Sequence, residues 1–212
     1  MENEIIDDRI VVANSVTKLG NECFGRVILA GSHGAVYAAY LAVKSGARGI
    51  ILNDAGRARD DSGISGGEYC DRLDIPFATV GSTSCRIGNG ESIRNEGVIS
   101  YVNRTAKLLG VELGMPSMIA ANKLTFAKVS NKVSAEYSEA RKELPSSGSE
   151  RKIVLMDSIS LVTNQDREKI IVSGSHGGML GKDPNTALKY DAFAGFFHDA
   201  GVGKADAGIT RL

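Results

Sequence analysis

The chain contains the same apolar run ending in Gly-Ser-His-Gly twice. "RVILAGSHGA" at residues 26–35 corresponds to "KIIVSGSHGG" at residues 169–178. The alignment runs without a gap from Ile10 over Ile153, and after a two-residue insertion it resumes with "ILNDAGRARDDSGIS" over "FFHDAGVGKADAGIT". Because chance does not preserve the order of so many motifs, the pattern predicts an internal duplication.

Each copy has the pattern of an α/β unit. The runs "IVVAN" and "RVILA" are short, apolar and β-branched, as is typical of strands buried on both faces of a parallel sheet. "AVYAAYLAVKSG" follows the first motif and ends at Gly46, which predicts a helix, and "RGIILND" predicts the next strand. A strand-helix-strand order indicates a right-handed crossover between parallel strands. We therefore expect duplicated β-α-β units on mostly parallel sheets, in a Rossmann-like, three-layered α/β fold with a truncated second copy.

The remaining segments predict how the two copies are connected. The first copy continues with a helix near residues 67–73, a strand from Ile75 and a longer helix over residues 97–110. Residues 117–143 are charged and predict a helical bridge, whereas the Pro-Ser-Gly composition of residues 144–152 predicts a flexible connector. The expected boundaries are thus a first repeat at 1–116, a helical connector and linker at 117–150, and a second, shorter repeat at 151–212.

The short second repeat leads to an expectation about assembly. The sequence stops soon after its second Asp-Ala-Gly. Unless the gene has been shortened, we expect the first lobe or another subunit to cover the apolar surface of the second lobe. Uncovered apolar surface favours self-association. We therefore expect a homo-oligomer.

The composition narrows the class of partner. There are 25 basic and 25 acidic residues and only 6% aromatic residues, which does not favour nucleic acid as a partner. No basic leader and no apolar run of roughly 18 residues is present, so we expect a cytoplasmic protein without membrane contact. Cys23, Cys70 and Cys85 are widely spaced and odd in number, which predicts small buried side chains rather than disulfides or a zinc ribbon.

All three histidines lie on loops that correspond between the two copies. His33 and His176 belong to the Gly-Ser-His-Gly motifs, and His198 occupies the position that Asn53 has in the first copy. These loops follow neighbouring strands, whose carboxyl ends form the usual ligand site of a parallel sheet. The candidate catalytic residues are His33, Asp54, His176, Asp199, Ser32 and Ser175, and the candidate ligand-binding residues are Gly31, Gly34, Asn53, Gly174, Gly177, His198, Arg57 and Arg86.

Several of these residues also have a purely structural interpretation. Glycines permit a tight turn from strand to helix, and Ser32 and Ser175 can cap the helices that follow. Arg57 and Arg86, together with Arg59 and Lys204, would hold a carboxylate or phosphate if their side chains turn inward. The clustering of the histidines is what favours a functional interpretation.

Three chemistries use this set of residues. The favoured one is general acid-base catalysis by histidine with Asp54 as its partner. The second makes Ser32 or Ser175 a nucleophile, with histidine as base and Asp54 or Asp199 orienting it. The least favoured places a divalent metal on His33 with Asp54 and Asp60 or Asp61, or on His176, His198 and Asp199. We therefore predict no metal site, and the cofactor stays unknown.

The sequence Ser32-His33-Gly34 after a buried strand resembles the histidine loop of caspase-type cysteine peptidases. In that family the next strand ends in the catalytic cysteine, whereas here it ends in Asn53-Asp54, and the next cysteine along the chain is Cys70. The resemblance therefore stops before the essential residue, and we do not adopt it.

Together these patterns predict an enzyme that acts on a small, polar, carboxylated metabolite, with hydrolysis of an amide or ester as the favoured reaction. A lyase or an isomerase would use the same residues. The alternative is a non-catalytic ligand-binding, anion-binding or regulatory subunit, in which the serines and loop amides bind an anion and the histidines only donate hydrogen bonds.

Overall fold

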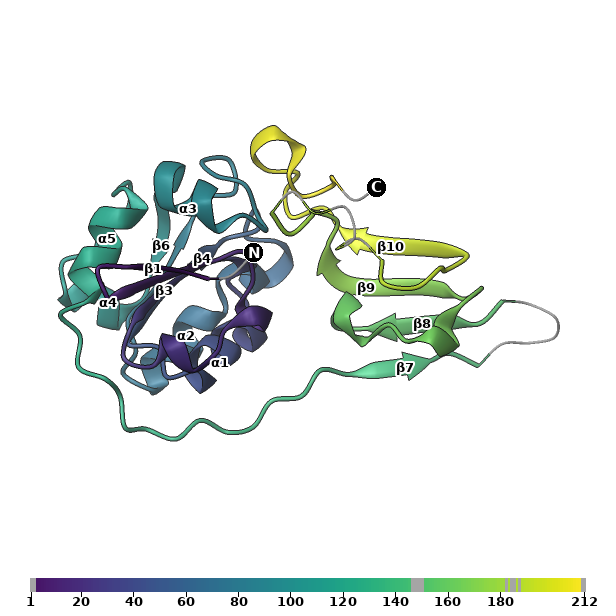
Figure 1. Cartoon of the computed structure of the whole chain (residues 1–212), viewed down its shortest axis with the longest axis horizontal. Coiled ribbons are helices and arrows are strands. Elements are labelled where there is room, and N and C mark those ends of the chain that lie inside the picture. Colours follow the sequence, from purple (N-terminus) through teal and green to yellow (C-terminus); the bar gives the residue numbers. More distant parts are fainter. Residues whose placement is uncertain (1–2, 146–150, 182, 184–185, 187, 211–212) are drawn as a thin grey trace.

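The chain folds into two lobes, each built on its own mostly parallel sheet (Figure 1). The computed structural model describes residues 3–145, 151–181, 183, 186 and 188–210. The first sheet has six strands in the order β1-β2-β3-β4-β5-β6, and the second has four in the order β10-β9-β8-β7. An extended connector, residues 127–140, runs between the lobes. The mixed α/β class predicted from the sequence is thus confirmed.

The first lobe is a three-layered unit. Its strands are β1 (Glu4–Ile6), β2 (Ile10–Ala13), β3 (Val27–His33), β4 (Gly49–Asn53), β5 (Phe77–Val80) and β6 (Ile99–Val102). Its helices are α1 (Val36–Lys44), α2 (Gly66–Arg72), α3 (Gly90–Glu96), α4 (Arg104–Leu108) and α5 (Ser117–Leu124), with 3-10 turns η1 (Val16–Lys18), η2 (Asn21–Cys23) and η3 (Arg59–Ile64). β2 to β5 are parallel, and β1 and β6 pair antiparallel at the two edges.

Alternating side chains fill the two faces of the first sheet. Ile28 and Ile50 lie in the cluster that includes residues of α1 and α2, whereas Leu29 and Ile51 lie in the cluster that includes residues of α3 and α5. All four are completely buried. Burying a side chain of this size contributes about 1.5–3 kcal/mol, so the apolar strand runs account for the stability of this lobe.

Among the described residues, the apolar side chains of the second lobe pack on one face of its sheet. Its strands are β7 (Arg141–Glu143), β8 (Ile153–Met156), β9 (Ile170–His176) and β10 (Ala194–His198), with 3-10 turns η4 (Ile159–Leu161), η5 (Asn164–Asp166) and η7 (Lys204–Asp206). On the other face Leu155, Val172 and Phe196 stand in register and are 37%, 37% and 58% exposed. We call these three residues the open face. The residues aligned with them in the first copy, Val12, Leu29 and Ile51, are at most 5% exposed because α3 and α5 cover that side.

Two helical predictions fail. Within residues 97–110 the β-branched run of β6 pairs with β5 instead, and a helix, α4, starts only after Asn103. The Asn103 side chain accepts hydrogen bonds from the backbone N–H groups of Phe77 and Ala106, so it fixes β5 and caps α4 at once.

The expected helical bridge is formed only by α5, which packs on the first sheet. The connector after it is extended because it binds the first lobe through side chains. Ser130 donates to the carbonyl of Leu73, and Tyr137 packs between Tyr40 and Tyr69, with ring centroids 5.4 and 5.6 Å apart. β7 then adds to the second sheet. The predicted flexible linker at residues 144–152 lies largely outside the described residues, and the predicted domain boundaries stay predictions.

The cysteines and the helices agree with two further expectations. Cys23, Cys70 and Cys85 are free and buried, as predicted. Burial raises the pKa of the Cys85 thiol to about 11, so it is not a thiolate at neutral pH. Within the described residues, no helix has the length and apolar character that a membrane crossing needs.

A left-handed turn follows β4 and recurs after β10. Ala55, Gly56, Arg57 and Ala58 have φ of 50°, 68°, 66° and 55°, and the aligned Ala200, Gly201, Val202 and Gly203 have 51°, 69°, 60° and 72°. In both turns the third N–H donates to the carbonyl of the aspartate, over 2.7 Å from Arg57 to Asp54 and 2.8 Å from Val202 to Asp199. Non-glycine residues in this region cost about 1–3 kcal/mol each, so both turns store strain.

Ala58 gives a test of this strain. Its φ of 55° and ψ of −176° lie in a region that essentially only glycine occupies, and the second copy has Gly203 there. We expect Ala58→Gly to raise the free energy of unfolding by about 1 kcal/mol, after the larger unfolded-state entropy of glycine is subtracted. Urea denaturation measures this change. The control, Ala120→Gly inside α5, should lower stability by about 1 kcal/mol. A loss of stability in both variants would show that Ala58 stores no backbone strain that glycine relieves.

Candidate functional site

The two lobes meet where their left-handed turns touch. Gly56 and Gly201 lie so close that a Cβ on either residue would stand 2.9 Å from the Cα of the other. Both positions therefore exclude any side chain. Around this contact Ala55, Ala200 and two further residues, Ile87 and Ala207, form a small buried apolar cluster.

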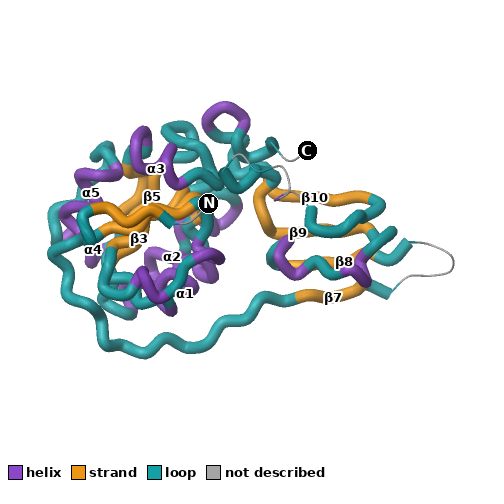
Figure 2. Tube along the Cα trace, in the orientation of Figure 1, coloured by secondary structure: helices purple, strands orange, loops and turns teal. Residues whose placement is uncertain are grey.

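Hydrogen bonds from the second lobe to the loop after β5 extend this contact. Gly181 N–H donates to the carbonyl of Gly88 over 2.6 Å, and Lys204 N–H donates to the carbonyl of Ser82 over 2.8 Å. The Lys204 ammonium group lies 3.0 Å from the carboxylate of Glu96 in α3. The loops after β9 and β10 consequently lie against the first lobe beside α3 (Figure 2).

This junction brings the histidines of the two copies together. His33 is paired in register with Asn53 at the ends of β3 and β4, and His176 is paired with His198 at the ends of β9 and β10. His33 and His198 also interact across the lobes. Burial, and secondarily the neighbouring His198, lower the pKa of His33, so its imidazole is neutral at pH 7.

All three imidazoles make the same local hydrogen bond. Nδ1 accepts the backbone N–H two residues later, over 3.3 Å at His33, 3.0 Å at His176 and 2.8 Å at His198. A neutral imidazole whose Nδ1 is an acceptor carries its proton on Nε2. A second proton on Nδ1 would break the bond to the backbone. The geometry therefore favours each ring as an Nε2–H donor rather than as a general base.

The aspartates shape the turns instead of pairing with histidine. Asp54 Oδ1 accepts the N–H groups of Gly56 and Ser82, both over 2.9 Å, and Asp199 Oδ1 accepts the N–H of Gly201 over 2.9 Å. His33 and Asp54 form neither an ion pair nor a hydrogen bond with each other, and His198 Nδ1 is 4.0 Å from Asp199 Oδ1. The expected partnership of His33 with Asp54 is thus not formed, because two backbone amides bind the Asp54 carboxylate, whereas His198 and Asp199 lie at the outer limit of ion-pair distance.

The hydroxyl groups of Ser32 and Ser175 hold turns in place rather than act as nucleophiles beside a histidine. Ser32 Oγ accepts the N–H of Val16 over 3.0 Å, and Ser175 Oγ accepts the N–H of Ile159 over 2.9 Å. Each hydroxyl thereby holds the 3-10 turn, η1 or η4, that follows the first strand of its copy. No hydrogen bond joins either hydroxyl to a histidine in the described part of the chain. The expected cap is also wrong at α1, whose N-cap is Ala35.

The glycines of the motif allow close approach of neighbouring backbone. A Cβ on Gly31 would lie 2.5 Å from the N of Asn89, one on Gly34 would lie 2.5 Å from the O of Gly63, and one on Gly174 would lie 2.8 Å from the O of Asp157. The N–H of Gly34 donates to the carbonyl of Asn53, and that of Gly177 to the carbonyl of His198, each over 2.8 Å.

Asn53 and Arg57 have polar partners other than the histidine rings. Asn53 is completely buried, where its amide accepts the N–H of Ala55 and donates to the sulfur of Cys85. Arg57 pairs with Asp61 over 2.9 Å, and Arg86 is exposed. The loop after β5, with Ser82 and Gly88, also belongs to the junction, although the sequence pattern singled out only Arg86 within it. Among the described residues, no three histidine, cysteine or acidic side chains group closely enough to hold a metal ion.

The sequence matches no protein-family model, and neither a curated protein nor a solved structure is significantly similar to it.

The His33 environment predicts how stability depends on pH. Because the pKa of His33 is lower in the folded state than its ordinary value of 6.5, the unfolded chain binds the proton more readily. This contribution to stability is complete above about pH 6.5 and is lost as the pH falls toward the folded-state pKa. We expect the free energy of unfolding, measured by urea denaturation, to decrease less between pH 7.5 and pH 5 in His33→Asn than in the wild type. An NMR titration that gave His33 a pKa of 6.5 or more would contradict this expectation.

Proposed function

We propose that this protein binds a small carboxylated metabolite at the junction of the lobes, with the Nε2–H groups of His33 and His198 as donors. The observation that carries this proposal is the shared geometry of the imidazoles, in which Nδ1 is held by a backbone N–H. Neutral N–H donors stabilise a carboxylate or a carbonyl oxygen without adding a mobile proton. His33 is partly buried, where hydrogen bonds are stronger than in water, and His198 is exposed.

The second candidate function is an enzyme that hydrolyses an amide or ester of such a metabolite. A neutral imidazole with a lowered pKa polarises a carbonyl group and stabilises a developing oxyanion, and this property of His33 favours catalysis. General acid-base catalysis by histidine with aspartate has less support, because Asp54 is bound to two backbone amides. The nucleophilic serine also has less support, because Ser32 and Ser175 accept backbone N–H groups.

The proposal also includes the duplicated architecture, the relation to Rossmann-like folds and the cellular location. A duplication is supported by the recurrence of the same φ values and the same turn hydrogen bonds after β4 and β10. The expected β-α-β unit has less support in the second copy, because no α-helix lies between β9 and β10 among the described residues. A Rossmann-like relation has less support, because the strands of the first sheet follow chain order whereas doubly wound sheets reverse it. A cytoplasmic location stays a prediction from the sequence.

A histidine-to-asparagine substitution tests the two candidate functions. Asparagine keeps the acceptor for the backbone N–H, as Asn53 does for Ala55, but removes the Nε2–H donor. We expect His33→Asn and His198→Asn each to weaken binding of small carboxylates such as lactate and succinate about tenfold, measured by calorimetry. Arg104→Gln, at an exposed position at the start of α4, is the control and should leave the affinity unchanged.

Turnover separates the alternatives. Hydrolysis of small amides or esters by the wild type, abolished in His33→Asn, would establish the enzyme. Binding without any turnover would establish the binding module. If neither histidine variant changed affinity or turnover, the junction would not be the site.

The predicted homo-oligomer has its own test on the open face. Sheet faces of this kind are normally buried, so we expect the wild type to sediment as a dimer or larger species. Phe196→Glu places a charge in the open face and should shift the protein toward the monomer, whereas Lys107→Glu, at an exposed position of α4 in the first lobe, should not. A wild type that stayed monomeric at micromolar concentrations would refute self-association.

A further inference from the structure

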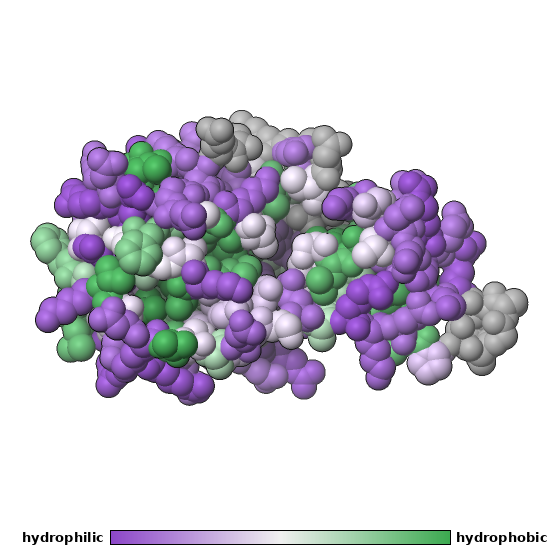
Figure 3. Space-filling view, turned by 60° about the horizontal axis from the view of Figure 1, so that its bottom comes forward, coloured by the Kyte–Doolittle hydropathy of each residue, from purple (hydrophilic) through white to green (hydrophobic). Residues whose placement is uncertain are grey.

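A cavity lies on the side of the first lobe that faces the connector, and none of the three histidines lines it. Its volume is about 800 Å³, which falls in the range of small-molecule sites. Figure 3 looks toward this side and shows the surface hollowed between the two lobes. The lining comes from η1, η2, α1, the connector and η4, which means that both lobes contribute to it.

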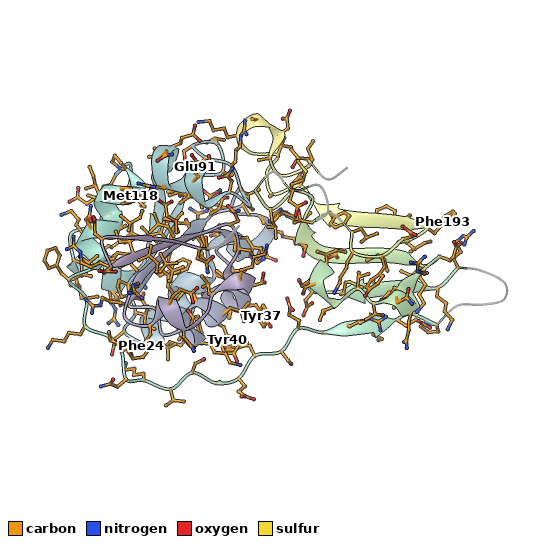
Figure 4. The ribbon with its side chains drawn as sticks, in the orientation of Figure 1. Phe24, Tyr37, Tyr40, Glu91, Met118 and Phe193 are labelled. Carbon is orange, nitrogen blue, oxygen red and sulfur yellow. The ribbon has the colours of Figure 1, made fainter. Side chains whose placement is uncertain are left out.

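Helix α1 forms one long wall of the cavity. Tyr37, Leu41 and Lys44 are four and seven residues apart on one helical face, so the wall extends about 10 Å at 1.5 Å per residue. Phe24 closes one end of the wall, where a Cβ on Gly46 would lie 2.6 Å from its ring. Tyr37 lies toward the second lobe at the other end (Figure 4).

The cavity holds one positive and one negative side chain. The Lys44 ammonium group is 5.7 Å from the centre of the Tyr40 ring, and Glu139 reaches the cavity from the connector. These two charged groups do not form an ion pair with each other, and no other ion pair of either is found in the described part of the chain. Opposite charges held apart in one cavity match a ligand that also carries both charges.

The environment of the acidic group supports this interpretation. Burial, with a smaller contribution from Asp157, raises the pKa of Glu139, and the hydroxyls of Ser158 and Ser160 partly offset this increase. Burial, followed by Glu139, raises the pKa of Tyr37. A cation bound beside Glu139 would favour its ionised form and offset the cost of burial.

The rest of the lining is largely apolar. Val16, Leu19 and Leu41 supply aliphatic surface, and Phe24 leaves 71% of its surface exposed at the rim. An exposed aromatic side chain beside an apolar hollow offers contact area to a ligand with an apolar body. A purely polar metabolite would leave this surface unused.

We propose that this cavity binds an apolar zwitterion of about the size of a dipeptide, with its carboxylate on Lys44 and its ammonium group on Glu139. The length of the α1 wall favours a ligand whose two charges are separated by an apolar body over a single amino acid. Because Glu139 and Ser160 lie outside the first lobe, the bound ligand would tie the connector and the second lobe to α1. The inference does not depend on the function of the histidines.

Calorimetry with the full chain and the dipeptide Leu-Leu tests the proposal. N-acetyl-Leu-Leu lacks the ammonium group and Leu-Leu amide lacks the carboxylate, so each should bind at least about tenfold more weakly than Leu-Leu. Free leucine should also bind more weakly, because it spans less of the wall. Equal affinities for Leu-Leu and either blocked peptide, tighter binding of leucine, or no heat of binding with millimolar Leu-Leu would overturn the proposal.

Two variants test which charged group of the dipeptide each side chain binds. Lys44→Met should weaken Leu-Leu binding about tenfold but leave Leu-Leu amide unchanged, whereas Glu139→Gln should weaken Leu-Leu but leave N-acetyl-Leu-Leu unchanged. Lys107→Met, in the last turn of α4, and Glu136→Gln, in the same connector, are the matched controls and should bind as the wild type. Thermal unfolding confirms that each variant is folded. A loss of affinity in the controls equal to that in the cavity variants would refute the assignment.

Discussion

The close contact between Gly56 and Gly201 is the constraint on which the candidate site depends. Two backbones can approach so closely only where neither residue carries a side chain, and both glycines sit in left-handed turns that follow the last aligned strand of each copy. This contact brings the carboxyl ends of two separate sheets to one place. It therefore creates a junction that neither lobe has alone, and the histidines of both lobes lie at it.

The two copies use the same turn with different side chains. Asn53 and His198 each accept the N–H two residues later, so either residue type satisfies the backbone. Their surroundings differ, because the loop after β5 buries Asn53 against Cys85, whereas the second sheet ends at β10 and leaves His198 partly open to solvent. The asymmetry of the candidate site thus follows from the position of β10 at the edge of its sheet, whereas β4 is flanked by β5. Among the described residues, the open face of the second sheet also has no layer like the one that α3 and α5 provide in the first.

The apolar strands of both copies, α1 and α2 were predictable because their burial follows from short-range patterns of apolar residues. The failures occur where long-range contacts outweigh local preference. Residues 99–102 have neighbours that favour a helix, yet they join the edge of the sheet because β5 offers an unpaired backbone. The connector is rich in helix-forming residues, yet it is extended because Tyr137 and Ser130 bind the first lobe.

The sequence by itself determined the repeat, the class of fold and the residues that line the turns, since periodic burial and glycine positions are local properties of a chain. Only the tertiary structure decided which partners those residues have. It paired His33 with Asn53 and His176 with His198 at the strand ends, bound the serines and aspartates to backbone amides, and formed the cavity lined by Lys44 and Glu139. Hydrogen bonds and charge pairs act over a few ångströms, so they depend on how distant segments pack, and no spacing along the chain encodes that distance.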